Sequence, residues 1–252
     1  MKIIFVGAGP GDPELLTVRA RKALRKCRIC IFAGSLVSPA VMKIVPKEAE
    51  LHDSAHMALE EIMDVCRRAR DRGIDAVRLH SGDPSLYGAI REQMSGLDRL
   101  GIPYEVIPGV SAFQAAAAAL KAELTAPEVS QTVILTRTSG RTRVPPPQEL
   151  KELARSQSTL CIYLLGDKID EVARALVPFY GDACPAAVVY HASWPDQSVV
   201  EGALSEIAGK AGRAGIGRTS VIIVGQALSR GAPASKLYDA AFSHGFRKGR
   251  KG

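Results

Sequence analysis

The stretch DAVRLHSGDPSLYGAIREQM, from Asp75 to Met94, decides the fold. Its first part, AVRLH, alternates apolar and polar residues, which predicts a short half-buried strand ending at Ser81-Gly82. Asp83-Pro84 then favours a helix start, because Asp caps helices and proline fits the first helical position. Strand, glycine turn and helix form a concave corner of the kind that binds ligands in α/β sheets, although a plain strand-to-helix turn has the same pattern. Apolar residues continue the helical spacing at Leu86, Ile90 and Met94.

The composition is that of a globular α/β enzyme. With 252 residues, the chain can form one large domain or two of roughly 110 to 130 residues. Hydrophobic residues make up 46% and charged residues 23%, which argues against disorder. No apolar run approaches the roughly 18 to 20 residues of a membrane span, and Met1-Lys2 leads into a strand rather than a signal peptide. We therefore expect a cytoplasmic protein with no membrane partner.

The net charge of +7 is concentrated at the end of the chain. Residues 236–252 carry five basic residues and one acidic residue, which leaves +3 for the rest. We expect this glycine-containing basic tail to be flexible. The distribution argues against nucleic-acid binding and still suits an anionic small molecule.

The cysteines and histidines do not predict a metal site. Five cysteines fit a reducing compartment, and the C-x-x-C pair Cys27 and Cys30 has no second pair to complete a zinc site. His52 and His56 have helical spacing but no Glu follows His52, so H-E-x-x-H is absent and a helix N-terminus is favoured instead.

The order of predicted elements favours two α/β domains. In residues 1–120 we predict strands at 2–7, 29–33 and 104–107 beside the strand of the opening stretch, with helices at 14–26, 54–72 and 113–120. This alternation predicts a mainly parallel sheet. Residues 121–128 form the predicted join to a second domain, 121–235. There, strands at 132–136, 159–165, 186–192, 199–203 and 219–225 and helices at 148–155, 168–179 and 204–211 predict a mixed sheet, with a hairpin around Trp194.

Three glycine-containing turns, at Pro10, Gly82 and Ser111, predict a ligand cleft between the two domains. The first, GAGPGDP, resembles a dinucleotide fingerprint, but Asp12 stands where the third glycine is required and Pro10 lacks an N–H. A dinucleotide-dependent oxidoreductase is therefore a weaker alternative. No G-x-S-x-G or G-x-x-x-x-G-K-[ST] motif is present, so a reaction that depends mainly on positioning remains.

Four motifs in order resemble the tetrapyrrole methylases, which transfer methyl groups from S-adenosylmethionine. They are VGAGPGDPELLT (6–17), SGDP (81–84), PGVSA (108–112) and YHASWPDQ (190–197). Within the family, AGSLV (33–37), SLYGAI (85–90) and PEVSQT (127–132), running on to GRT (140–142), are similar to members that methylate precorrin-4, or its cobalt form, at C11 to give precorrin-5. Gly34 stands where members that make precorrin-2 usually have Asp, which argues against methylation at C2 and C7.

The resemblance implies two α/β domains of the class III type, a homodimer, and S-adenosylmethionine, converted to S-adenosylhomocysteine, in the cleft between the domains. It carries over no catalytic residue. A different ring carbon and, less favoured, an RNA-directed methylase remain alternatives. The substrate is an anionic tetrapyrrole, so guanidinium groups are expected around it, with Arg137, Arg141 and Arg143 as candidates unless they are merely solvated. The donor contacts implied by motif position are Pro10, Gly82, Asp83, Leu86, Tyr87, Ser111, Ala112, Leu165, Ala192 and Thr219.

Overall fold

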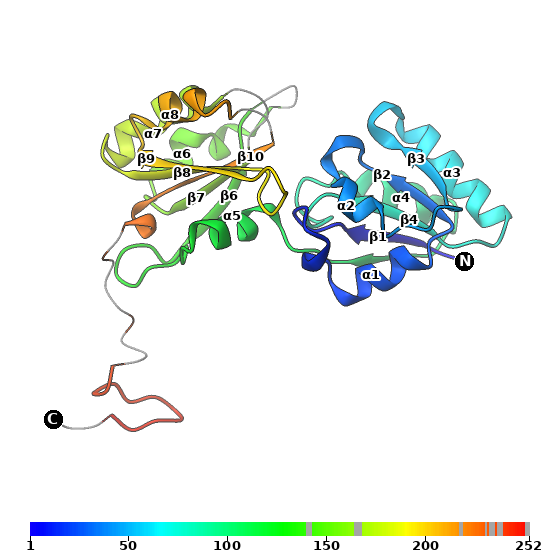
Figure 1. Cartoon of the computed structure of the whole chain (residues 1–252), viewed down its shortest axis with the longest axis horizontal. Helices are drawn as coiled ribbons and strands as arrows, with labels where there is room; N and C mark the ends of the chain where they lie inside the picture. Colours follow the sequence, from blue (N-terminus) through cyan, green and yellow to red (C-terminus); the bar gives the residue numbers. More distant parts are fainter. Residues whose placement is uncertain are drawn as a thin grey trace. The chain divides into compact units, whose positions relative to one another are not determined.

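The computed structural model describes residues 1–139, 143–163, 168–216 and 219–229, together with 231, 235 and 239–249. These residues form two compact units (Figure 1). Unit 1 comprises Met1–Ala116 and His191–Gln197, and unit 2 comprises the described residues of Ala117–Tyr190 and Ser198–Gly252.

Unit 1 is built on a five-stranded, fully parallel sheet. The strand order is β3-β2-β4-β1-β5, and all four strand pairs are parallel. β1 consists of apolar, largely β-branched residues, because helices cover both faces of the sheet. β4, predicted to be half-buried, is instead buried along its whole length, including its polar residues Arg78 and His80. The predicted mainly parallel sheet is confirmed. The strands are β1 (Ile3–Gly7), β2 (Ile29–Phe32), β3 (Glu50–Asp53), β4 (Ala76–His80) and β5 (Tyr104–Ile107).

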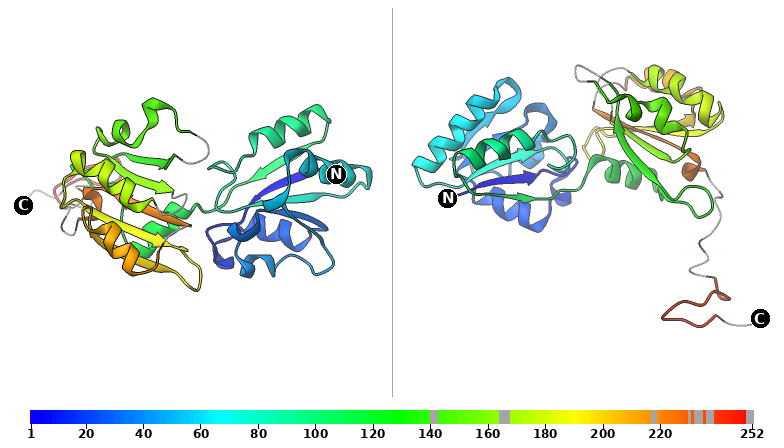
Figure 2. Two further views of the ribbon diagram at one scale, coloured as in Figure 1. Left: turned by 90° about the horizontal axis from the view of Figure 1, so that it is seen from above. Right: turned by 180° about the vertical axis from the view of Figure 1, so that it is seen from behind.

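Helices cover both faces of this sheet. α1 (Val18–Arg25) and α2 (Pro39–Met42) pack on one face, against a core that includes Val6 and Leu79. α3 (Leu59–Asp71) and α4 (Arg91–Arg99) pack on the other face, around Phe5. The left view of Figure 2 shows α4 and α1 on opposite sides of the sheet. This doubly wound arrangement leaves the carboxyl ends of the strands to carry the loops.

Three helices of unit 1 begin later than predicted. The helix expected from Glu14 is a 3-10 turn, η1 (Pro13–Leu15), followed by α1, which the Thr17 side chain caps by accepting from Ala20 N–H. The helix expected from Ser54 is likewise η3 (Ser54–His56) and then α3. The helix expected from Asp83 begins only at Arg91, because Tyr87 and Ala89 adopt left-handed φ values and non-helical turns intervene. Strand β3 was missed, since its half-exposed sequence ELHD has a weak strand pattern and depends on pairing with β2. His52 therefore lies in a strand and not at a helix N-terminus.

Unit 2 contains a mixed five-stranded sheet of order β6-β7-β10-β8-β9. β6 and β7 are parallel and the other pairs antiparallel, and β8 and β9 form the predicted hairpin. The mixed sheet is confirmed. The strands are β6 (Val133–Arg137), β7 (Thr159–Tyr163), β8 (Pro185–Tyr190), β9 (Ser198–Ala203) and β10 (Ser220–Val224).

Three helices share one core with the inner face of this sheet. They are α6 (Leu150–Ala154), α7 (Ile169–Tyr180) and α8 (Ile207–Arg213), which pack on buried residues such as Leu160, Val188 and Ile222. α5 (Ala112–Leu120) begins in unit 1, and its residues from Ala117 on belong to unit 2. Further 3-10 turns are η2 (Gly34–Leu36), η4 (Pro146–Gln148) and η5 (Gln226–Leu228).

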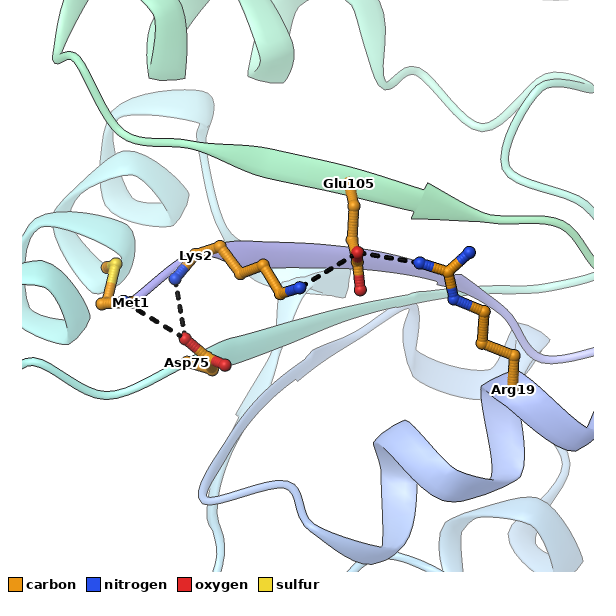
Figure 3. A network of polar contacts seen from close by, with 5 residues as sticks. All are labelled: Met1, Lys2, Arg19, Asp75 and Glu105. Atoms are coloured by element: carbon orange, nitrogen blue, oxygen red, sulfur yellow. Dashed lines mark hydrogen bonds and ion pairs between the residues drawn. The ribbon is translucent and has the colours of Figure 1, made fainter.

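Charged side chains fasten the amino end of the unit 1 sheet (Figure 3). The Lys2 backbone N–H donates to Asp75 Oδ1 over 2.7 Å, and the amino terminus lies 3.7 Å from the same oxygen. Glu105 Oε2 accepts from Lys2 Nζ at 3.1 Å and from Arg19 at 2.9 Å. These contacts tie β1 to its two neighbours, β4 and β5.

Candidate functional site

Three glycines bring the carboxyl ends of β1, β4 and β5 into direct backbone contact. A Cβ placed on Gly7 would lie 2.6 Å from the Gly109 Cα and 2.7 Å from the Gly82 carbonyl oxygen. A Cβ on Gly109 would likewise lie 2.9 Å from the Gly7 Cα. Real Cβ contacts are not this short, so these positions admit only glycine unless the backbone shifts. The sequence-predicted turns at Pro10, Gly82 and Ser111 therefore converge on one corner of unit 1, which we call the glycine corner (residues 7–13, 81–90 and 108–112).

Backbone hydrogen bonds join the first two turns of the glycine corner. Ala8 N–H donates to the His80 carbonyl at 2.7 Å, and Gly9 and Gly82 exchange bonds of 3.2 and 2.8 Å. Gly9 and Gly82 have φ values of 68° and 63°, in the left-handed region that glycine enters without steric cost. The ladder of the parallel sheet is thus extended past the strand ends by a short antiparallel bridge.

Asp83 ties the second turn to the third. Its Oδ1 accepts from the Ser85 N–H at 2.8 Å and from the Ser85 hydroxyl, and its Oδ2 accepts from the Gly109 N–H at 2.9 Å. Burial alone would raise the pKa of Asp83, but these hydrogen bonds outweigh it and hold the pKa below its usual value. The carboxylate therefore stays ionised at neutral pH and bonds to protein donors, which makes it an anchor of the corner rather than a general base.

The segment that follows Asp83 is strained. Tyr87 and Ala89 have φ values of 56° and 49°, which non-glycine residues rarely adopt. Gly88 between them packs so closely that a Cβ would lie 3.0 Å from the Pro84 carbonyl carbon. The Tyr87 side chain is 51% exposed and Leu86 is half-buried. An aromatic and an aliphatic residue thus lie in a strained segment at the surface of the corner.

The third turn leads directly into α5. Ser111 is buried, its N–H donates to Gln114 Oε1 at 2.9 Å, and its carbonyl accepts the first helical bond from Gln114 N–H at 3.1 Å. Ala112 opens the helix. Its N–H precedes the helical ladder and belongs to the electropositive end of the helix.

The loop His191–Gln197, between β8 and β9, packs on the first turn within unit 1. Trp194 Nε1 donates to the Pro10 carbonyl at 2.7 Å, and Asp12 N–H donates to Ser193 Oγ at 3.0 Å. Ala192, a predicted donor contact, is buried in this loop. Trp194 and Ser193 were missed as site residues by sequence reasoning, and the one available signal is that Trp194 is the single tryptophan of the chain.

A buried polar group lies on the α3–α4 side of the second turn. Arg78 donates to Gln93 Oε1 at 3.0 Å and to the carbonyls of Ile31 and Leu79 at 3.4 Å, and burial lowers its pKa to about 10. Burial, aided by Arg78, lowers the pKa of His80 to about 3, so the imidazole is neutral at pH 7. Its Nε2 is buried and has no hydrogen-bond partner among the described residues. Arg78 and His80 are thus buried on the α3–α4 side of β4.

The predicted site residues of unit 2 are only partly described. Arg137 is half-buried and donates to the carbonyls of Thr138 and Arg143, at 3.3 and 3.5 Å, and Arg143 is exposed. Thr219 is exposed and has a left-handed φ of 65° immediately before β10. Arg141 and Leu165 lie outside the described residues.

Within the described residues, no group of three or more His, Cys, Asp or Glu side chains could hold a metal ion. All five cysteines, including Cys27 and Cys30, are buried thiols. None of the helices in the described parts of the chain is long and apolar enough to cross a membrane.

The chain matches a known family model. Residues 2–208 match the model of the Tetrapyrrole (Corrin/Porphyrin) Methylases. The chain belongs to this family. The family resemblance inferred from the four glycine and tryptophan motifs is thereby confirmed.

Two relatives of this methylase chain are similar along almost its full length. A cobalt-precorrin-4 C(11)-methyltransferase of Methanocaldococcus jannaschii is 51% identical, and the match covers 99% of this chain and 97% of the relative. A precorrin-4 C(11)-methyltransferase of Pseudomonas aeruginosa is 46% identical over 99% of this chain and 100% of the relative.

Solved methylase structures share the fold. A cobalt precorrin-4 methyltransferase, described as a cobalamin biosynthetic enzyme, superposes with a TM-score of 0.87 at 38% identity and covers 91% of this chain and 96% of its own. A uroporphyrin-III C-methyltransferase of Thermus thermophilus, complexed with S-adenosylhomocysteine, superposes with a TM-score of 0.75 at 27% identity. The match covers 90% of this chain and 99% of that one.

Proposed function

We propose that this methylase transfers a methyl group from S-adenosylmethionine to C11 of precorrin-4, or of cobalt-precorrin-4, giving the corresponding precorrin-5 in cobalamin biosynthesis. The observation that carries the proposal is the identity of 51% and 46%, over 99% of the chain, to two relatives with that activity in their names. Those names include both the cobalt and the metal-free substrate, so both belong in the test.

The glycine corner is the proposed donor site. Its chemistry suits a large sulfonium donor, because the corner presents backbone and an exposed aromatic ring rather than a cluster of charged side chains. A Cβ built on Gly82 would find no protein atom nearer than 3.8 Å, so protein does not crowd this side of the second turn. The proposed donor contacts in unit 1 are Pro10, Gly82, Asp83, Leu86, Tyr87, Ser111, Ala112 and Ala192.

The geometry supports catalysis by positioning. Bound S-adenosylmethionine supplies an electrophilic methyl group whose carbon–sulfur bond breaks, with the electron pair left on sulfur, as a carbon–carbon bond forms at C11. The donor's positive charge disperses in that step, so a permanent anion beside the sulfur would give no advantage. Asp83 is committed to Ser85 and Gly109, and the neutral His80 is buried. Rigid backbone turns can still contribute on the order of 7 to 11 kcal/mol by fixing the reacting groups.

The acceptor carries many carboxylates, and we propose Arg137 and Arg143 as two of its binding groups. Guanidinium groups suit carboxylates because they donate two parallel hydrogen bonds. Arg141 is proposed for the same role on the same chemical ground, and Leu165 and Thr219 keep the donor contacts that the family resemblance implies. We further propose a cytoplasmic homodimer that binds no nucleic acid. Sedimentation equilibrium tests the dimer, and the absence of salt-dependent RNA binding tests the last point.

The decisive experiment locates the transferred carbon. The enzyme is incubated with S-adenosylmethionine labelled with ¹³C in the methyl group and with enzymatically prepared precorrin-4 or cobalt-precorrin-4, and the product is examined by NMR. A new labelled methyl at C11 is expected. Label at another ring carbon would retain the family and overturn the assignment of position, whereas no transfer to either substrate would overturn the proposed substrate.

A further inference from the structure

The loop His191–Gln197 is held in one conformation by its own hydrogen bonds. Ser193 N–H donates to Gln197 Oε1 at 2.7 Å, Trp194 N–H donates to the His191 carbonyl at 2.8 Å, and Gln197 N–H donates to the Trp194 carbonyl at 3.1 Å. His191 and Ser193 have left-handed φ values of 45° and 71°. Two such residues are costly, so the surrounding contacts must determine the loop strongly.

Two hydrogen bonds from this loop flank Gly11 in the first turn. Trp194 Nε1 reaches the Pro10 carbonyl before it, and Ser193 Oγ accepts from the Asp12 N–H after it. The indole also lies directly on Gly11, since a Cβ there would come within 2.9 Å of the indole Cγ. The first turn is therefore bonded on both sides of Gly11 and covered by the indole at Gly11 itself.

The indole is in turn supported by His191 and Asp196. The His191 ring stacks on it with ring centroids 4.5 Å apart and an interplanar angle of 26°. His191 Nδ1 lies 2.9 Å from Asp196 Oδ2, which fixes the plane of the imidazole. Gly11 and His191 thus contact the indole, and its N–H is held on the Pro10 carbonyl.

We propose that Trp194 is a positioning residue for the methyl donor, which keeps the turn at Pro10 and Gly11 in its donor-binding conformation before the donor arrives. The inference rests on the proposed function, because Pro10 is one of the proposed donor contacts. A turn that is already ordered loses less conformational entropy on binding, so preorganisation raises affinity without any direct contact between the indole and the donor. Removal of the N–H or the ring should therefore weaken donor binding while most of the fold is kept.

The test compares Trp194→Phe with a matched control, Tyr180→Phe. Tyr180 also donates from an aromatic side chain to a carbonyl, that of Ser158 at 2.6 Å, but it belongs to unit 2 and not to the glycine corner. Titration calorimetry with S-adenosylhomocysteine is expected to show about five- to tenfold weaker binding for Trp194→Phe, the loss of one hydrogen bond, and wild-type binding for Tyr180→Phe. Ser193→Ala removes the other hydrogen bond to the first turn, that from the Asp12 N–H, and should weaken binding about threefold. This variant replaces Trp194→Phe in the test if Trp194→Phe does not fold.

A second readout uses the single tryptophan of the chain. Because the turn is already in its donor-binding conformation, saturating S-adenosylhomocysteine should leave the wavelength of the wild-type Trp194 emission maximum unchanged, whereas a clear shift would show that the turn rearranges on binding and would overturn the preorganisation. If the wild type binds and both Trp194→Phe and Ser193→Ala bind equally well, the positioning role is overturned and the proposed function stands. If the wild type binds no S-adenosylhomocysteine, the proposed function itself is overturned.

Discussion

The two ends of the parallel sheet in unit 1 are built in opposite ways. At the amino end, Lys2 and Arg19 pair with Glu105, and the amino terminus lies beside Asp75 (Figure 3). At the carboxyl end, three strands meet through Gly7, Gly82 and Gly109 with no side chain between them. Long charged side chains close an end that has only to be stable, whereas bare backbone forms the end where a ligand is proposed to bind.

This difference has an energetic consequence. Exposed ion pairs are screened by water and contribute little each, so the amino end tolerates substitution. Backbone packed against backbone cannot move aside, so one methyl group at the carboxyl end strains two strands at once. Substitutions at the two ends should therefore have effects of different size on the free energy of unfolding.

The largest effect is expected for Gly109→Ala. The new methyl would lie 2.9 Å from the Gly7 Cα and nearer still to the Gly82 carbonyl, and both are backbone groups. We expect a loss of about 3 kcal/mol in the free energy of unfolding, measured by urea denaturation. The control is Gly212→Ala in α8, where a Cβ meets nothing within 4 Å. Because alanine has a higher helix propensity than glycine, this variant should gain up to about 1 kcal/mol in the free energy of unfolding. Equal effects at the two glycines would contradict the packing account.

A smaller, pH-dependent effect is expected for Asp83→Asn. The Asp83 pKa is lowered in the folded protein, so its stabilisation is fully present above the ordinary carboxyl pKa of about 4 and is lost as the pH falls through the lower, folded-state pKa. At pH 7 the variant should be less stable by about 1 kcal/mol, and the difference should shrink below pH 4. Urea denaturation at pH 7 and pH 3 measures both values, and a difference independent of pH would rule out this role of the carboxylate.

The smallest effect is expected at the amino end, for Glu105→Gln. Lys2 and Arg19 are 42% and 66% exposed, so their pairs with Glu105 should contribute less than about 1 kcal/mol together. The midpoint temperature of thermal unfolding should be slightly lower for Glu105→Gln than for the wild type in low salt. This difference should disappear at about 1 M salt, where the Debye screening length is about 3 Å. A loss as large as that for Gly109→Ala would abolish the contrast between the two ends.

The sequence predicts elements well where local pattern and tertiary packing agree. Strands β1 and β10 lie where the sequence places them, since burial on both faces gives them continuous apolar runs. β4 lies where its alternating pattern places it, although it is fully buried rather than half-buried. The predicted helix start at Asp83 is wrong even though Asp83 Oδ1 accepts from the Ser85 N–H as a cap would, because Tyr87 and Ala89 then adopt left-handed φ values that interrupt a helix. Local spacing does not show this backbone conformation.

The candidate site was predictable in its glycines and not in its supports. Gly82 stands out in the sequence because a glycine directly after a strand indicates a turn, where the backbone adopts a conformation that other residues avoid. The bond from Trp194 to Pro10 spans 184 residues, and no local pattern links a proline-containing turn to a tryptophan in a later hairpin. Trp194 belongs to the family motif YHASWPDQ, but its place on the first turn follows only from the tertiary fold.

The central claim, that the glycine corner holds the donor, is tested most directly by two glycines with the same backbone conformation. Gly82 and Gly73 have φ values of 63° and 64°, and a Cβ on either clears other protein atoms by at least 3.8 Å, so alanine should impose a similar backbone cost at both. Only Gly82 belongs to the glycine corner, while Gly73 follows α3.

Titration calorimetry of S-adenosylhomocysteine into the wild type, Gly82→Ala and Gly73→Ala therefore separates strain from ligand contact. The account predicts wild-type affinity for Gly73→Ala and at least about tenfold weaker binding for Gly82→Ala, since the added methyl would occupy space left for the donor. Equal affinities in all three proteins would contradict it.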